Sequence, residues 1–194
     1  LALEHAMLVF ASLAAAVALG VPMGIVAARV RAFAQPLLAA AGLVQTVPSL
    51  ALLAFLIPLT GIGAVPALAA LFLYALLPIA RNTHAGLEGV PAGLRDAARA
   101  LGLTPAQALA RIELPLAAPV ILAGVKTAAV VNVGTATLAA FVGAGGFGER
   151  IAQGLAVNDH RLLLAGAIPA AALALVVHAA FELAERALVR RRGR

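Results

Sequence analysis

Residues 162–182 read LLLAGAIPAAALALVVHAAFE, a run in which only the last residue, Glu182, carries a formal charge. A helix that crosses the hydrocarbon core of a bilayer needs about 20 mostly apolar residues. Four further runs meet this requirement, and they cover approximately residues 6–28, 37–57, 64–80 and 116–142. The sequence therefore predicts an all-α integral membrane protein with about five transmembrane helices.

The composition favours this prediction over a soluble fold. The chain has 194 residues, of which 63% are hydrophobic and 11% are charged, and its mean hydropathy is +1.05. Soluble domains carry about 25% charged residues, so this chain cannot cover a compact surface with charge. We expect a single transmembrane domain over residues 1–194, because these residues leave no room for a separate soluble enzyme.

The formal net charge of +6 and the pI of about 11.5 are also found in nucleic-acid-binding proteins. Here the basic residues are spread between apolar runs, and the chain has one Tyr and no Trp on which bases could stack. We therefore expect no nucleic-acid partner. The enrichment of cytoplasmic loops in Lys and Arg explains the basic excess better.

Five spans would divide the arginines unevenly between the two sides of the membrane. One side would carry Arg29, Arg31, Arg81, Arg95, Arg99, Arg111, Arg186, Arg190, Arg191, Arg192 and Arg194, and the other Arg150 and Arg161. Because the basic side is normally cytoplasmic, we expect a multi-pass protein with its N-terminus outside and its C-terminus in the cytoplasm. Residues 143–160 would then face outward.

The longest connection, approximately residues 81–115, is predicted to form two short cytoplasmic helices. Pro91 suits the first turn of the first helix, and Gly102 suits the position just after its end. Thr104 to Gln107 read TPAQ, which is typical of a capping box with Pro at the first helical position. The second helix is expected to end near Ile112, before the fourth span.

The first of these short helices is predicted to be amphipathic. Leu94, Ala98 and Leu101 form an apolar stripe, and Arg95, Asp96 and Arg99 form a polar face. Such a helix can insert its apolar ridge into the groove of a partner protein. The alternative is a helix that lies on the surface of anionic lipid.

The same connection carries the motif spacing of a known family. It reads Asp96-Ala97-Ala98, three residues, Gly102, nine residues, Ile112, one residue, and Leu114-Pro115. This pattern resembles the EAA loop of ABC-transporter permease subunits, E-A-A-x3-G-x9-I-x-L-P, with Asp in place of the first Glu. In that family the EAA helix is the coupling helix that docks on a cytoplasmic ATPase. The resemblance implies a type I ABC importer permease core whose ATPase-coupling residues are Arg95, Asp96, Ala97, Ala98, Arg99, Leu101 and Gly102.

Further segments narrow the resemblance to one branch of this family. Residues 45–53, QTVPSLALL, resemble the QT-P-S-A-L segment of glycine betaine/choline-type osmoprotectant permeases, as do residues 61–63, 76–83 and 143–148. The likeness covers about residues 20–182. It implies a permease in the bacterial inner membrane for small quaternary-ammonium osmoprotectants such as glycine betaine or choline. The glycine-rich run also occurs in methionine-type permeases, so another small solute such as methionine is the alternative cargo.

The resemblance also implies the partners of the chain. They are a cytoplasmic ABC ATPase dimer, a second permease copy or a paralogue, an extracytoplasmic substrate-binding protein and the membrane lipid. Residues 143–148, GAGGFG, lack the Lys of a phosphate-binding P-loop, and no Walker motif occurs elsewhere. The chain has no Cys, and its four His show no metal-ligand spacing. We therefore expect no catalytic residue, cofactor or metal in this chain, with ATP bound by the partner.

Polar residues inside the spans are candidates for the translocation pathway. They are Gln45, Thr46, Pro48 and Ser49 in the second span, and Asn132, Thr135 and Thr137 in the fourth. The alternative role for them is hydrogen bonding between helices. Pro48 is expected to break the backbone hydrogen bonds of the second span. Lys126 is expected to extend to the cytoplasmic interface.

Two other classes of membrane protein fit the sequence less well. A membrane-embedded enzyme would need paired carboxylates, a His–Asp cluster or a Ser beside a base, and the spans show none of these patterns. A proton-coupled transporter usually carries acids within the membrane. Glu182 is the only acid near the interior of a predicted span, and it lies at the end of that span.

Overall fold

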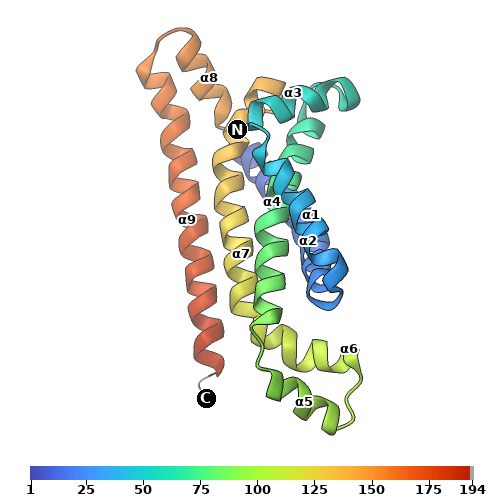
Figure 1. The fold of residues 1–194 in the computed structure, drawn as a ribbon. Coiled ribbons are helices and arrows are strands. Elements are labelled where there is room, and N and C mark those ends of the chain that lie inside the picture. Colours follow the sequence, from blue (N-terminus) through green and yellow to red (C-terminus); the bar gives the residue numbers. More distant parts are fainter. Residues whose placement is uncertain (193–194) are drawn as a thin grey trace.

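The computed structural model describes residues 1–192, and that part of the chain is helical without a β-strand (Figure 1). The predicted all-α membrane fold is confirmed. In chain order the elements are α1 (Ala2–Arg29), α2 (Arg31–Thr46), α3 (Ser49–Thr60), α4 (Ala64–Glu88), α5 (Ala92–Ala100), α6 (Pro105–Ala108), the π-helical turn η1 (Leu109–Glu113), α7 (Leu114–Thr135), the 3-10 segment η2 (Ala136–Val142), α8 (Gly148–Ala156) and α9 (His160–Arg192).

Helix α4 forms the centre of the bundle and packs between α1 and α7 (Figure 1). Its side chains Leu71, Ile79 and Leu87 are almost completely buried. Small residues let the backbones approach closely, as is common between membrane helices. A Cβ atom on Gly24 of α1 or on Gly124 of α7 would lie less than 3 Å from atoms of α4.

Helices α8 and α9 form an antiparallel pair on the outer side of α7 (Figure 1). The chain turns between them at residues 157–159, and α9 then runs back along α7. Much of the remaining surface of α9 is apolar and exposed, including Leu164, Ile168 and Leu175. Such a surface suits contact with lipid tails.

Contacts between distant segments define two ends of the bundle. At the glycine end, the N–H of Gly63 donates to the carbonyl of Val142 (2.7 Å), and the N–H of Gly146 donates to Glu4 (3.3 Å). At the loop end, Arg29 binds Glu113 (2.9 Å), and α5 and α6 extend beyond the spans (Figure 1). The chain therefore crosses the bundle five times, and Leu1 and the end of α9 lie at opposite ends (Figure 1).

The predicted second span, residues 37–57, is not one helix but two, α2 and α3, and the expected break at Pro48 is confirmed. Helices α2 and α3 meet at an angle of 99°. Pro48 has no N–H to continue a helix, and it forces the preceding residue, Val47, into an extended conformation with φ −73° and ψ 126°. The bent pair still carries the chain from the loop end back to the glycine end.

The predicted third span, residues 64–80, is too short. Helix α4 continues through Pro78 to Glu88, so the connection beyond the helices begins at Gly89 rather than at residue 81. Pro78 removes the donor that would bond the carbonyl of Tyr74, four residues earlier. That carbonyl instead accepts a hydrogen bond from Gln45 Nε2 of α2 (2.8 Å). Neighbouring side chains that satisfy freed carbonyls make proline tolerable inside a membrane helix.

The predicted break between the second short helix and the fourth span does not occur. Residues 105–142 follow one continuous helical course. Its wide π turn is closed by a bond from the N–H of Leu114 to the carbonyl of Leu109. Pro115 cannot donate a hydrogen bond and would crowd the carbonyl of an ordinary α turn, so the wider turn lets the helix pass this proline.

Candidate coupling helix and translocation pathway

Helix α5 ends in the capping arrangement that the sequence predicts. Gly102 has a φ of +75°, a conformation that favours glycine. The N–H of Gly102 donates to the carbonyl of Arg99 (2.9 Å), and that of Leu103 donates to the carbonyl of Ala98 (3.1 Å). These two bonds form a Schellman motif. At the other end, Pro91 is the N-cap residue rather than a member of the first turn.

The predicted apolar stripe of α5 is divided between two surfaces. Ala98 is buried against its own chain, whereas Leu94 and Leu101 are exposed to 42% and 80%. Asp96 and Arg99 are exposed and pair with each other at 3.3 Å. The surface of α5 that a partner can reach therefore includes Leu94, Asp96, Ala97 and Arg99, and the exposed C-cap residue Leu101 extends it.

Arg95 of α5 points toward the bundle and not toward a partner. Its Nη2 donates to the carbonyl of Leu87 in the last turn of α4, and its Nε lies 3.8 Å from Glu113 Oε2. Glu113 is 4% exposed and also binds Arg29 at the end of α1. The sequence prediction did not include Glu113. The sequence feature that could have identified Glu113 is an acidic residue directly before an apolar span, because a carboxylate that is buried there requires a cationic partner.

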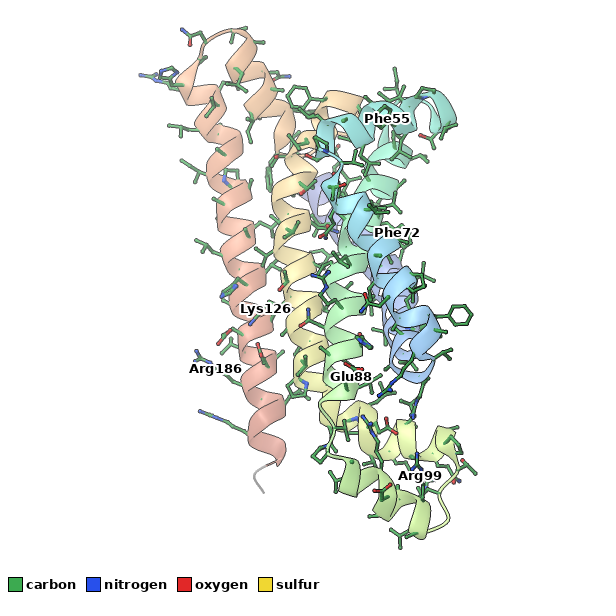
Figure 2. All side chains as sticks on the ribbon, viewed as in Figure 1. Phe55, Phe72, Glu88, Arg99, Lys126 and Arg186 are labelled. Carbon is green, nitrogen blue, oxygen red and sulfur yellow. The ribbon has the colours of Figure 1, made fainter. Side chains whose placement is uncertain are left out.

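The capping box that precedes the fourth span is confirmed. Thr104 Oγ1 accepts from the N–H of Gln107 (3.3 Å), and the Gln107 side-chain oxygen accepts from the N–H of Thr104 (2.9 Å). Pro105 occupies the first helical position. This cap fixes the start of α6 close to α5, and Figure 2 shows Arg99 on this pair of helices, beyond Glu88 at the end of α4.

The bend between α2 and α3 is held against α4 by two reciprocal bonds. Gln45 Nε2 donates to the Tyr74 carbonyl, and the Tyr74 hydroxyl donates to the carbonyl of Val47. Thr46 bonds back to the carbonyl of Leu43 in its own helix (2.7 Å). Gln45, Thr46 and Pro48 are exposed at this bend. Gln45 therefore serves as a contact between helices in this chain.

The structure brings two of the predicted pathway residues together. Ser49 of α3 and Thr135 of α7 line one small pocket of about 10 Å³, and the other lining side chains are apolar. That space is of the order that one water molecule needs. These two hydroxyl-bearing residues come from the two different predicted spans.

The other two pathway candidates on α7 and η2 lie apart from this pocket. Asn132 is completely buried and donates to Ser12 of α1 (3.1 Å), so it joins two helices. Thr137 is half-buried and bonds to the carbonyl of Gly134 (2.7 Å). The structure therefore separates Asn132, which faces α1, from the Ser49–Thr135 pair.

A second charged cluster joins α7 to α9. The amine of Lys126 binds Glu185 at 2.7 Å and Glu182 at 3.1 Å, and Arg186 lies 3.4 Å from Glu182. Figure 2 shows Lys126 and Arg186 in the same region of these two helices. Lys126 therefore forms ion pairs within the chain instead of extending alone to the interface. Two acids of α9, Glu182 and Glu185, therefore lie beside the membrane helix α7, whereas the sequence indicated Glu182 alone.

The glycine-rich run 143–148 forms a tight turn. Gly143, Gly145 and Gly146 all have positive φ, and the ring of Phe147 lies 4.9 Å from that of His5.

Among the described residues, no group of three or more His, Asp or Glu side chains could hold a metal ion.

Comparisons with known proteins agree with this geometry. A family model described as the binding-protein-dependent transport system inner membrane component matches residues 20–194. The choline transport system permease protein OpuBB of Bacillus subtilis is 43% identical over 185 residues, which are 95% of this chain and 85% of that protein. The osmoprotectant import permease protein OsmW of Salmonella typhimurium is 44% identical over 182 residues, 91% of this chain and 85% of that protein. A chain from an inward-facing structure of the MetNI methionine ABC transporter has a TM-score of 0.86 at 26% identity, and the match covers 95% of this chain and 93% of that one.

Proposed function

The chain belongs to the family of binding-protein-dependent transport system inner membrane components, and from this premise we propose that it is the permease subunit of an ATP-driven importer for small quaternary-ammonium osmoprotectants. Choline and glycine betaine are the proposed cargo. The chain forms part of the translocation pathway and carries out no covalent chemistry. A separate ATPase subunit supplies the energy.

The observation that carries the cargo class is the extent of the likeness to the two named permeases. Relatives named for choline and for osmoprotectant import are 43% and 44% identical over more than nine-tenths of this chain. The likeness to the methionine transporter is strong in backbone fold but reaches only 26% identity. The relatives therefore favour the osmoprotectants over methionine.

The exposed side of α5 is the proposed docking surface for the ATPase dimer. It presents Leu94 and Leu101 together with the paired charges of Asp96 and Arg99. A short helix with exposed apolar side chains can enter a groove on a partner. Arg95, Ala98 and Gly102 act indirectly in this proposal, because they fix the position and the end of the helix.

The loop end of the bundle is proposed to face the cytoplasm. Arg29, Arg95, Arg99 and Arg111 gather at that end, whereas Arg150 and Arg161 lie on or beside α8 and the start of α9 at the other end. This distribution follows the positive-inside rule. A substrate-binding protein would deliver cargo at the glycine end, and two permeases would work with two ATPases.

The proposed pathway passes the Ser49–Thr135 pocket at the junction of α3, α4 and α7. The bend at Pro48 places the start of α3 beside this pocket. Hydroxyl groups are uncharged and form no ion pair with the quaternary ammonium group, so they allow the solute to pass without trapping it. Recognition of the quaternary ammonium group is assigned to the binding protein, because aromatic side chains that bind such groups are scarce in this chain.

A transport assay tests the proposal. The permease, its ATPase and its binding protein are reconstituted in liposomes loaded with ATP, and labelled choline, glycine betaine or methionine is added outside. We expect ATP-dependent accumulation of choline or glycine betaine and no accumulation of methionine. Uptake of methionine alone would refute the cargo assignment and leave the permease assignment intact.

A further inference from the structure

Glu113 is an unusual residue for its position. Among the residues whose side chains the structure describes, it is the acid that is buried most deeply, with 4% exposed. It ends the π turn η1, directly before the membrane helix α7. A charged carboxylate in such surroundings needs cationic partners to offset the loss of water.

Two arginines from different elements provide these partners. Arg29, the last residue of α1, places its Nη2 2.9 Å from Glu113 Oε1, and Arg95 of α5 places its Nε 3.8 Å from Glu113 Oε2. Arg95 also donates from Nη2 to the carbonyl of Leu87 in α4. We call Arg29, Glu113 and Arg95 the Glu113 bridge. It joins α1, α5 and the start of α7, and it also reaches α4.

Helix α5 has few other attachments to the bundle. All of its residues except Arg95 and Ala98 are exposed. Ala98 contributes only a methyl group, so Arg95 provides the directional polar contact between α5 and the membrane helices. The side chains of Arg29 and Arg95 are 39% and 33% exposed, but Glu113 is buried, so separating it from the arginines would leave a buried carboxylate without its cationic partners. The bridge is therefore expected to stay intact when α5 moves.

Open space lies on both sides of this bridge. A cleft of about 140 Å³ separates it from α6, and a second cleft of about 590 Å³ lies between the ends of α1 and α4. Arg29, Arg95 and Glu113 line both clefts. Close-packed side chains would resist a tilt of α5, whereas these clefts leave room for the bridge to move as a unit.

We propose that Glu113 is a positioning residue that carries the movement of α5 to α1 during the ATPase cycle. This inference rests on the proposed docking of the ATPase on α5. In this proposal, the single buried carboxylate of Glu113 links α5, where the ATPase docks, to α1. Without the charge of Glu113, α5 still binds the ATPase, but its movement no longer reaches α1.

The first test compares Glu113→Gln with Glu88→Gln in the reconstituted complex. Glu88 is the matched control, because it lines the same larger cleft but its side chain is 61% exposed. The measured quantity is the amount of choline or glycine betaine transported per ATP hydrolysed. We expect Glu113→Gln to keep the ATPase bound and to lower this ratio about tenfold, a size typical of coupling between two sites. Glu88→Gln should leave the ratio unchanged.

A conformational readout separates coupling from a purely structural role. The chain has no Cys, so a single Cys at Ala92 in α5 or at Val26 in α1 can carry an environment-sensitive bimane label. In the unmodified complex, trapping with ATP and vanadate should change the emission of both labels. With Glu113→Gln, the Ala92 label should still respond and the Val26 label should not. This arm uses no cargo, so it tests the bridge even where the cargo assignment fails.

Several outcomes would overturn the inference. An unchanged transport ratio in Glu113→Gln would do so, as would a response of both labels in that variant. A lower yield or lower Tm with a normal ratio would show that Glu113 only stabilises the fold. If the complex with Glu113→Gln does not assemble, the same measurements are made on Arg95→Gln. That variant is less disruptive, because Glu113 keeps Arg29 as its partner. Normal coupling in Arg95→Gln would exclude the bridge.

Discussion

The close packing of α7 on α4 leads to a quantitative prediction at Gly124. A Cβ atom there would lie 2.5 Å from the Cβ of Asn82 and 2.7 Å from the carbonyl oxygen of Pro78. Carbon atoms in contact prefer separations of about 3.5–4.0 Å, so Gly124→Ala requires the helices to separate by about 1 Å. Overpacking of this kind costs about 1–3 kcal/mol. In a chain of this size that corresponds to a decrease in Tm of about 2–12 °C.

The same substitution at Gly134 provides the control, because both glycines belong to α7. No heavy atom of the described residues outside its own helix turn lies within 4 Å of a Cβ at Gly134. Alanine is a better helix former than glycine by about 1 kcal/mol, so Gly134→Ala should leave the Tm unchanged or raise it slightly. Thermal unfolding of the purified permease in detergent, followed by circular dichroism, measures both. Equal Tm values for the two variants would show that α4 and α7 are not in close contact at Gly124.

Three further predictions concern topology, docking and the second charged cluster. A Cys at Gln107 should resist an impermeant thiol reagent added to intact cells while a Cys at Asn158 reacts, and the reverse pattern would invert the proposed orientation. Gly102→Val should strain the end of α5 by about 1–2 kcal/mol, and Leu101→Glu should place a charge on the docking surface. Both variants should insert into the membrane but co-purify with less ATPase, and normal co-purification of both would exclude this surface. Lys126→Met leaves Glu185 without its cation and Glu182 with Arg186 alone, so the Tm should fall, and the Lys126→Arg control should lower it less. An unchanged Tm for the Met variant would show that the cluster does not stabilise the fold.

Prolines show how far the sequence determines this fold. Runs of apolar residues predicted the approximate positions of the spans, but three prolines within or beside them have three different outcomes. Pro48 ends a helix, Pro78 lies inside one, and Pro115 follows a π turn. A proline is tolerated inside a membrane helix where a neighbour satisfies the carbonyl that it leaves free. Gln45 does so for Tyr74 from another helix, and no local pattern reveals that contact.

The candidate site was predictable where its geometry is local. The end of α5 at Gly102 and the capping box at Thr104 depend on residues within a few positions of each other, and both are present. The role of Arg95 was not predictable in this way. Its partner Glu113 and the contact of Glu113 with Arg29, 84 positions away in sequence, depend on how the helices pack. Sequence spacing alone therefore assigned Arg95 to the outer surface of α5.

The exposed side of α5 is the surface proposed to couple this permease to an ATPase. The most direct measurement is site-specific cross-linking in the assembled complex, with a single Cys at Leu101, directly after α5, and a thiol-to-amine reagent. We predict a cross-linked species that contains the permease and the ATPase subunit, and none when the single Cys is at Asn158 near the other end of the bundle. If the Cys at Leu101 gives no ATPase product, or the Cys at Asn158 does, the end of α5 is not the surface that contacts the ATPase.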